Sequence, residues 1–362
     1  MSFSLRPFTP PDFTQEKFRN APNATLVPCP KDGVAPEAYH AMSIFPEYFK
    51  VDGQWIMAKE SRMDCVPVYE NGVIFVREFR LLKAGDLVFT GRTENCENGI
   101  YVYPDGFRES TVQQDVFAFR QNRSRETAFS KDYDEIYDLL RHDREHGKIV
   151  WVMGPAFAFD YDARNAFAKL VNGGYVHAVL AGNALATHAL EGAYLNTALG
   201  QNIYTTQNQP NGHYNHLDLL NRVRYHGSVS KFIEEEQIDN GIIYNLEKNH
   251  IPYVLGGSIR DDGPLPPVFA NVYEAQDAMR NQVRDATTVI CMATMLHTIA
   301  TGNMTPSFRV MPDGTVRQIY FYCVDIAEFV VNKLADRGSL SARGIVTNVQ
   351  DFVVNLSTGL GL

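Results

Sequence analysis

The sequence predicts an α/β protein with a mostly parallel nucleotide-binding sheet, preceded by a small β-rich domain. From residue 148 onward, short apolar runs alternate with helical patterns, and this alternation is typical of βαβ units. Residues 51–107 instead carry closely spaced strand signals with turns between them. Hydrophobic residues make up 45% of the 362-residue chain and charged residues 21%, so the protein can bury a substantial core.

The first 147 residues divide into an arm and a β-rich segment. Residues 1–50 are rich in Pro, Phe and Asn without a clear period, which indicates an extended arm or an irregular packing segment. Residues 51–147 are expected to form a substrate or cap domain that ends in a charged helix over Tyr133–His146. Its predicted strands, separated by turns such as Asn71-Gly72, are Gln54–Met57, Gly72–Val76, Asp86–Thr90 and Ile100–Tyr103.

Residues 148–362 are predicted to form the nucleotide-binding domain. After the first strand, Ala163, Phe167 and Leu170 fall at helical spacing, and Gly173-Gly174 ends that helix. Further helical patterns lie between the later strands, so the sheet is expected to be mostly parallel. The predicted strands are Lys148–Gly154, Tyr175–Ala181, Tyr253–Leu255, Thr288–Met292, Ile319–Val324 and Gly344–Val346.

Composition excludes several classes of function. The formal net charge is −9 and there is no basic stripe, which argues against nucleic acid as a partner. No apolar run reaches the roughly 20 residues that span a bilayer, and the N-terminus lacks the apolar core of a secretory signal. The five cysteines are widely spaced and form no CxxC pair, so we expect no metal site and a cytoplasmic protein.

Small or amide-bearing residues are expected where several strands of the second domain end. They are Gly154-Pro155-Ala156, Gly182-Asn183-Ala184, Gly302-Asn303-Met304 and Asp325. Small residues at a strand–helix junction let the backbone approach a pyrophosphate, and an acidic residue at a strand end can bind ribose hydroxyls. Their coincidence favours a dinucleotide site, although GxGxxG is absent and ordinary turns explain any single junction.

The segment Gly256–Pro266 presents charged side chains directly after a buried strand. Arg260, Asp261 and Asp262 are consecutive there, and adjacent carboxylates repel unless a cation, a proton or an amine matches them. Ligands of open α/β sheets bind at such strand ends. The alternative is a polar loop in which the aspartates cap a turn.

Three other positions are candidates for chemistry. His213 and His216 are too few to form a typical metal site, so a helix cap or a contact to substrate or cofactor is the better interpretation. His297 follows an apolar strand and is either a general acid or base or a hydrogen-bonded core residue. Asp64 is a surface turn residue, unless the β-rich domain covers the cleft of the nucleotide domain and brings it to the substrate.

Five segments occur in the same order in a known family. They are Gly182–His188, Gly212-His213-x-x-His216-Leu217, Tyr253–Pro266, Ala293–His297 and Asp336–Ser339. The chain thereby resembles the archaeal-type, NAD-dependent ornithine cyclodeaminases, whose conserved region was first named after lysine-oxoglutarate reductase/saccharopine dehydrogenase. The resemblance covers residues 45–357, and the long SIRDDGPLP segment is more specific than a short motif.

The resemblance implies tightly held NAD, a fold similar to the deoxyhypusine synthase-like NAD-binding group, and conversion of L-ornithine to L-proline with loss of ammonia. Hydride would leave the substrate and return to the cyclic imine, so there is no net redox. Orientation and electrostatics would be the protein's contribution. We expect a homo-oligomer that acts on a small basic amino acid. The family's cofactor-associated strand ends map onto Gly154, Pro155, Ala156, Asn183, Ala184, Gly302, Asn303, Met304 and Asp325.

Such a substrate needs groups that bind one carboxylate and two amines. Arg260 could hold the α-carboxylate through two parallel hydrogen bonds. Asp261 or Asp262 could hold the distal ammonium or take a proton from an amine. Asp64 and His297 are secondary candidates for proton transfer.

The chain also departs from the family pattern. The family usually carries an additional N-terminal regulatory-like domain, whereas this chain has a different, shorter arm. The segment Met311-Pro312-Asp313-Gly314 looks inserted. The family's His-Asp-Ile-Glu is His188-Ala189-Leu190-Glu191 here, and its Asp-Ile-Asn-Pro is Asp325-Ile326-Ala327-Glu328. These changes bear on the substrate more than on the cofactor. Two alternatives are an NAD-dependent amino- or imino-acid oxidoreductase with net redox turnover, and a non-catalytic NAD-binding sensor.

Overall fold

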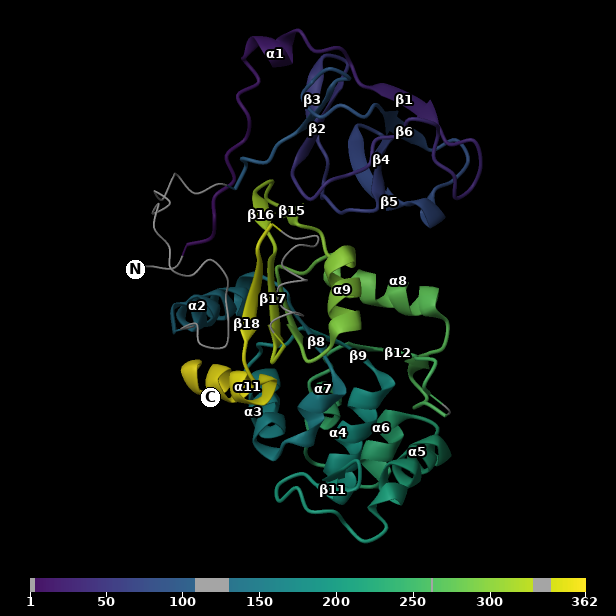
Figure 1. Cartoon of the computed structure of the whole chain (residues 1–362), viewed down its shortest axis with the longest axis vertical. Coiled ribbons are helices and arrows are strands. Elements are labelled where there is room, and N and C mark those ends of the chain that lie inside the picture. The colour runs from purple at the N-terminus through teal and green to yellow at the C-terminus, as the bar shows by residue number, and fades with distance from the viewer. Residues whose placement is uncertain (1–3, 108–129, 262, 328–339) are drawn as a thin grey trace.

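The computed structural model describes residues 4–107, 130–261, 263–327 and 340–362. Figure 1 shows a β-rich part at one end of the molecule, next to the β15–β16 hairpin. The parallel sheet occupies the middle, and helices α4, α5 and α6 lie at the opposite end.

The β-rich part contains two antiparallel sheets. The first has the order β1-β6-β4-β5 and the second β3-β2-β7. Phe49, Ile74, Phe89 and Ile100 from both sheets share one core. The elements are α1 (Glu16–Arg19), β1 (Thr25–Pro28), β2 (Glu47–Val51), β3 (Gln54–Met57), β4 (Cys65–Glu70), β5 (Val73–Glu78), η1 (Phe79–Leu81), β6 (Leu87–Thr90) and β7 (Ile100–Val102).

The prediction that residues 1–50 form an irregular arm is wrong for two stretches. β1 pairs with β6, and β2 is the central strand of its sheet. The turn from β2 to β3 is Asp52-Gly53, both with positive φ, which is the two-residue hairpin that an Asp-Gly pair favours. Asn71-Gly72 makes the same kind of turn between β4 and β5.

The second part is built on a seven-stranded parallel sheet of order β13-β12-β9-β8-β14-β17-β18. The chain starts at the central strand β8, winds outward in one direction and then in the other, as in doubly wound nucleotide-binding folds. The predicted fold class is therefore confirmed. The strands are β8 (Ile149–Met153), β9 (Ala178–Gly182), β12 (Tyr253–Gly256), β13 (Val268–Phe269), β14 (Thr288–Met292), β17 (Tyr320–Asp325) and β18 (Ala342–Val346).

Helices cover both faces of this sheet. In β8, Trp151 packs in the core with α2, α3, α7 and α11, whereas Val150 packs on the other face with α8 and α9. Burial on both faces explains why the strands read as continuous apolar runs. The helices are α2 (Ser130–His146), η2 (Pro155–Phe159), α3 (Tyr161–Asn172), α4 (Asn183–Leu195), η3 (Gly212–Tyr214), α5 (Asn215–His226), α6 (Val229–Glu235), α7 (Ile242–Lys248), α8 (Val272–Val283), α9 (Met295–Met304) and α11 (Val349–Gly359).

Helix α2 belongs to the α/β part, because Ile136, Leu139 and Leu140 lie in the same core as Trp151. A domain boundary at residue 147 would cut this helix from the core in which it packs. Two short hairpins complete the fold. They are formed by β10 (Thr197–Ala198) with β11 (Gln201–Asn202) and by β15 (Phe308–Val310) with β16 (Val316–Gln318).

The β-rich part docks at the amino-end edge of the parallel sheet. Ser307 donates its backbone N–H to the carbonyl of Ser61 at 3.0 Å and accepts from Ile319, which directly precedes β17. Arg280 of α8 pairs with Glu78 of β5, Nε to Oε1 at 2.7 Å. The β-rich part therefore lies away from the carboxyl ends of the strands within one chain.

Candidate active site

The carboxyl ends of the central strands bring most of the predicted cofactor residues to one edge. Gly154 follows β8, Asn183 follows β9 and Asp325 ends β17. Pro155 and Ala156 open η2, and Ala184 lies in the first turn of α4. Because β8, β9, β14 and β17 pair in parallel, these residues share the edge at which α/β proteins bind ligands.

Gly302, Asn303 and Met304 do not follow a strand, so that expectation is wrong. They form the last turn of α9, and Met304 packs in the core beside Val150. β14 ends at Met292 instead, and the chain turns there through Ala293, a non-glycine residue with φ 52°. The junction after β14 is therefore Ala293-Thr294, the start of the family segment Ala293–His297, and not Gly302-Asn303.

Gly154 lies where the winding of the sheet reverses, between β8 and β14. Its N–H donates to the carbonyl of Met292 at 2.9 Å. A Cβ at this position would lie 1.9 Å from the carbonyl oxygen of Ala293, so only glycine fits. Ala293, on the other side of this contact, has a positive φ, which is uncommon for a residue other than glycine.

Two helices begin at this edge without a side-chain cap. The N-cap residues of α4 and α9 are Gly182 and Thr294, and neither caps its helix through a side chain. In α3, by contrast, the Asp160 carboxylate accepts from the N–H of Ala163 at 2.7 Å. The first-turn N–H groups of α4 and α9 are thus available to an anion.

The loop after β12 is held by Asn183. The Asn183 Oδ1 accepts from the N–H of Leu265 at 3.0 Å, and its Nδ2 donates to Asp261 Oδ1 at 3.4 Å. Asp261 Oδ2 accepts from the N–H of Ser258 at 2.9 Å. Asp261 therefore closes the turn within the loop, and Asn183 connects both ends of the loop to α4.

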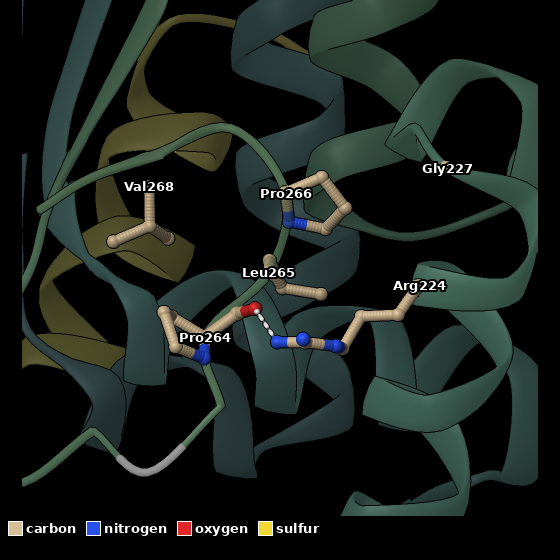
Figure 2. Close-up of a pocket in the computed structure, with 6 residues that line it drawn as sticks. All are labelled: Arg224, Gly227, Pro264, Leu265, Pro266 and Val268. Atoms are coloured by element: carbon tan, nitrogen blue, oxygen red, sulfur yellow. Dashed lines mark hydrogen bonds between the residues drawn. The ribbon is translucent and has the colours of Figure 1, made fainter.

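Arg224 of α5 holds the same loop from its other side. Its Nη1 donates to the carbonyl of Pro264 at 3.3 Å, as Figure 2 shows. A cavity of about 410 Å³ lies at this contact. It is lined by Arg224, Gly227, Pro264, Leu265, Pro266 and Val268.

Arg260 is exposed on this loop, and no described residue hydrogen-bonds or pairs with its guanidinium. It is thus available to a carboxylate from solution. Asp262 lies outside the described residues.

His297 lies in the first turn of α9, against the end of β9. A Cβ placed on Gly182 would be 3.2 Å from His297 Cε1. Burial lowers the pKa of His297, so its imidazole is neutral at neutral pH. The structure thereby brings His297 close to Asn183 and to the loop that carries Arg260.

The structure does not bring Asp64 to these residues within one chain. Asp64 is exposed in a turn with φ 61° and lies close in sequence to Ser61, which contacts the amino-end edge of the sheet.

His213 lies in η3 and His216 in the first turn of α5. Within the described ranges, no cluster of three His, Cys, Asp or Glu side chains could hold a metal ion.

A buried carboxylate near this edge was missed as a candidate. Glu191 of α4 is fully buried and accepts a hydrogen bond from His188 Nδ1 at 3.1 Å. Burial alone would raise the pKa of Glu191. The hydrogen bonds from His188, Gly200 and Thr197 together have the larger effect, so the net shift of the pKa is downward and the carboxyl group stays ionised. The signal was available as the i, i+3 spacing of a histidine and a glutamate on a predicted helix.

Comparison with known proteins places these features in a family context. Residues 134–356 match the family model described as arginine dihydrolase ArgZ-like, C-terminal, Rossmann fold. A Methanopyrus kandleri protein named ornithine cyclodeaminase is 38% identical over 91% of this chain and 77% of its own. A Nostoc protein, the bifunctional arginine dihydrolase/ornithine cyclodeaminase AgrE, is 33% identical over 93% of this chain and 47% of its own.

Two solved structures are similar to the whole chain. A conserved LOR/SDH protein from Methanococcus maripaludis is 37% identical with a TM-score of 0.84, covering 94% of this chain and 98% of that one. The ternary complex of AgrE with ornithine and NAD⁺ is 32% identical with a TM-score of 0.58, covering 94% of this chain and 46% of that one.

Among the residues that the structure describes, no helix is both long and apolar enough to cross a membrane.

Proposed function

Since the chain belongs to the archaeal-type ornithine cyclodeaminase family, we propose that it is an NAD-dependent cyclodeaminase that converts L-ornithine to L-proline and ammonia. The observation that carries the proposal is the loop after β12. It presents Arg260 at the carboxyl edge of a doubly wound sheet and is bound to Asn183 beside His297. A related protein, AgrE, has been solved with ornithine and NAD⁺ together.

The residues of this edge fit NAD. The uncapped N-termini of α4 and α9 offer N–H groups to a pyrophosphate, and Asp325 at the end of β17 can accept hydrogen bonds from ribose hydroxyls. Gly154 keeps the backbone at the reversal point free of a side chain. When bound, NAD⁺ supplies a hydride acceptor for the substrate α-carbon and later returns the hydride to the cyclic imine.

The charged loop is assigned to the substrate. Arg260 would pair with the α-carboxylate, because its planar guanidinium matches a carboxylate in two parallel hydrogen bonds. Both oxygens of Asp261 already accept hydrogen bonds within the fold, so we assign Asp261 to holding the loop. Asp262 stays the predicted partner of the distal ammonium, and the neutral His297 a candidate for proton transfer.

The test is turnover with three basic amino acids. The purified protein is incubated with NAD⁺ and with ornithine, lysine or arginine, and ammonia and cyclic products are quantified by mass spectrometry. We expect ornithine to give proline and ammonia in equal amounts. Release of neither product from any of the three would refute the proposal.

We also propose that the protein is a homo-oligomer. Light scattering of the purified protein measures its oligomeric state directly.

A further inference from the structure

We propose that His188 is a catalytic base of this site and that Glu191 is the residue that positions it. The inference deepens the proposed function and rests on it. It concerns the buried His188–Glu191 pair on α4, to which the proposed function assigns no role.

Glu191 is held in a single arrangement. Its Oε1 accepts from Thr197 Oγ1 at 2.8 Å and from the N–H of Gly200 at 3.1 Å. Its Oε2 accepts from the N–H of Leu199 at 3.2 Å and from His188 Nδ1 at 3.1 Å. All four partners act as donors to the carboxylate, so the proton of a neutral His188 is assigned to Nδ1.

The other ring nitrogen of His188 is left with a free lone pair. No described residue hydrogen-bonds to Nε2, although the residue is only 9% exposed. In known histidine bases, a carboxylate accepts a hydrogen bond from Nδ1–H and thereby fixes the tautomer and the orientation of the ring. Nε2 is then left to accept a proton.

His188 lies where three segments converge at the ligand-binding edge. Its ring centroid is 5.4 Å from that of Phe159 in η2, which follows β8, and 6.3 Å from that of His216 in α5. Ala184, in the first turn of α4, precedes His188 by four residues, so both lie on the same face of the helix. His188 therefore lies on the helix face that starts in the first turn of α4, at the edge to which the cofactor is assigned.

The reaction needs a base of this kind. A substrate ammonium must lose a proton before its nitrogen has a lone pair with which to act. In the proposed step an N–H bond of the ammonium breaks, its electron pair stays on the amine nitrogen, and the proton forms a bond to His188 Nε2. The Glu191 carboxylate stabilises the resulting imidazolium through Nδ1–H and stays ionised.

The decisive variant is His188→Asn. The asparagine amide can occupy the Nδ1 position and donate to Glu191, so the packing contact is kept and the proton-accepting nitrogen is lost. We expect kcat for ornithine to fall at least about 100-fold, while KM, NAD content and the melting temperature stay near those of the wild type. His250→Asn is the matched control. His250 is exposed, with φ 54°, and asparagine tolerates that conformation.

Two further readouts separate a base from a structural residue. Added imidazole should restore part of the rate to His188→Ala, because it supplies the missing base, and it should do nothing for the wild type. Glu191→Gln should lower kcat without changing KM for ornithine. If His188→Asn turns over ornithine at the wild-type rate, the pair is structural and the proposal is overturned.

A labelling experiment decides the point without turnover. Diethyl pyrocarbonate should modify His188 in the wild type, and NAD⁺ with ornithine, lysine or arginine, each tried separately, should protect it, as read from peptide masses. Protection by at least one of the three supports the placement of Nε2 in the site, and equal labelling with all three overturns it. Lack of ammonia release by the wild type refutes only the proposed function.

Discussion

At the scale of single residues, Asn183 shows how one side chain can hold a whole loop of the site in place. Its sequence position predicted a cofactor contact. In the structure its amide is used by the loop, through Leu265 N–H and Asp261 Oδ1, and Thr187 Oγ1 donates to it as well. The amide suits this place because it donates to one partner and accepts from another, which neither a carboxylate nor a hydroxyl does with the same reach.

Asn183→Asp should lower kcat/KM for ornithine by at least about tenfold. The new carboxylate would repel the one on Asp261, and this repulsion should displace the loop. The double variant Asn183→Asp/Asp261→Asn exchanges donor and acceptor and should recover part of the loss. Steady-state kinetics of the two single variants and the double variant measure this coupling. Losses that simply add in the double variant would mean that the two side chains act separately.

At the scale of elements, uninterrupted apolar strands were predictable, and strands that are very short or carry charged residues were not. The apolar runs of β8, β14 and β17 identify these strands because nothing polar interrupts them. β1 has only four residues and pairs with β6, which is distant in sequence. β2 is as long as β8 but includes the charged residues Glu47 and Lys50, so residues 1–50 showed no apolar period. Asp52-Gly53 was the available signal for the β2–β3 hairpin.

The candidate site was predictable to the extent that it follows strand ends. Asn183, Asp325 and the loop of Arg260 lie at the edge that the alternation of strands and helices implies. Gly302 was misplaced because the junction after β14 is made by Ala293 and Thr294, and the apolar residues that follow them form α9. The i, i+3 spacing of His188 and Glu191 was visible in the sequence, but the burial of the pair was not, because its partners at Thr197 and Gly200 depend on the tertiary fold.

Gly154→Ala tests the contact between the ends of β8 and β14. The added methyl would meet the backbone of Ala293, which cannot move aside as a flexible side chain can. We expect a loss of about 1–3 kcal/mol in the free energy of unfolding, the usual effect of overpacking, together with weaker NAD binding. Urea unfolding and a thermal shift with NAD⁺ measure the two effects.

Gly302→Ala is the matched control for this element-scale test. In α9 the nearest atom to an added Cβ is Phe321 Cζ at 3.8 Å, an ordinary contact. The variant should bind NAD as the wild type does and keep or gain stability, since alanine is the better helix former. A stability loss as large as that of Gly154→Ala would show that the steric argument at Gly154 is wrong.

At the scale of the whole molecule, a buried ion pair ties helix α2 to the amino ends of the sheet. Asp143 accepts from Arg317 Nη2 at 2.5 Å, from Thr287 Oγ1 at 2.6 Å and from Thr288 Oγ1 at 2.8 Å. Burial raises the pKa of Asp143, but the Arg317 charge and the hydrogen bonds from Thr287, Arg317 and His142 lower it more, so the net shift is downward.

This shift makes the stability of the protein depend on pH. Because the folded pKa lies below the unfolded value of about 4, the contribution of Asp143 is complete above that pH and is lost as pH falls through the folded pKa. Asp143→Asn should therefore lower the melting temperature at neutral pH. The gap between wild type and variant should narrow below about pH 4. A gap that stays constant from neutral to acidic pH would contradict the assignment.

The central claim is that the substrate is oxidised and its cyclic imine reduced again within one turnover, without net redox. Measuring two products in one reaction tests this claim most directly. The purified protein is supplied with ornithine and NAD⁺, and ammonia and NADH absorbance are followed together. We predict that ammonia accumulates steadily while NADH does not, because each hydride taken from the substrate is returned before the product leaves. Accumulation of NADH in proportion to ammonia would contradict the account and identify a simple oxidoreductase.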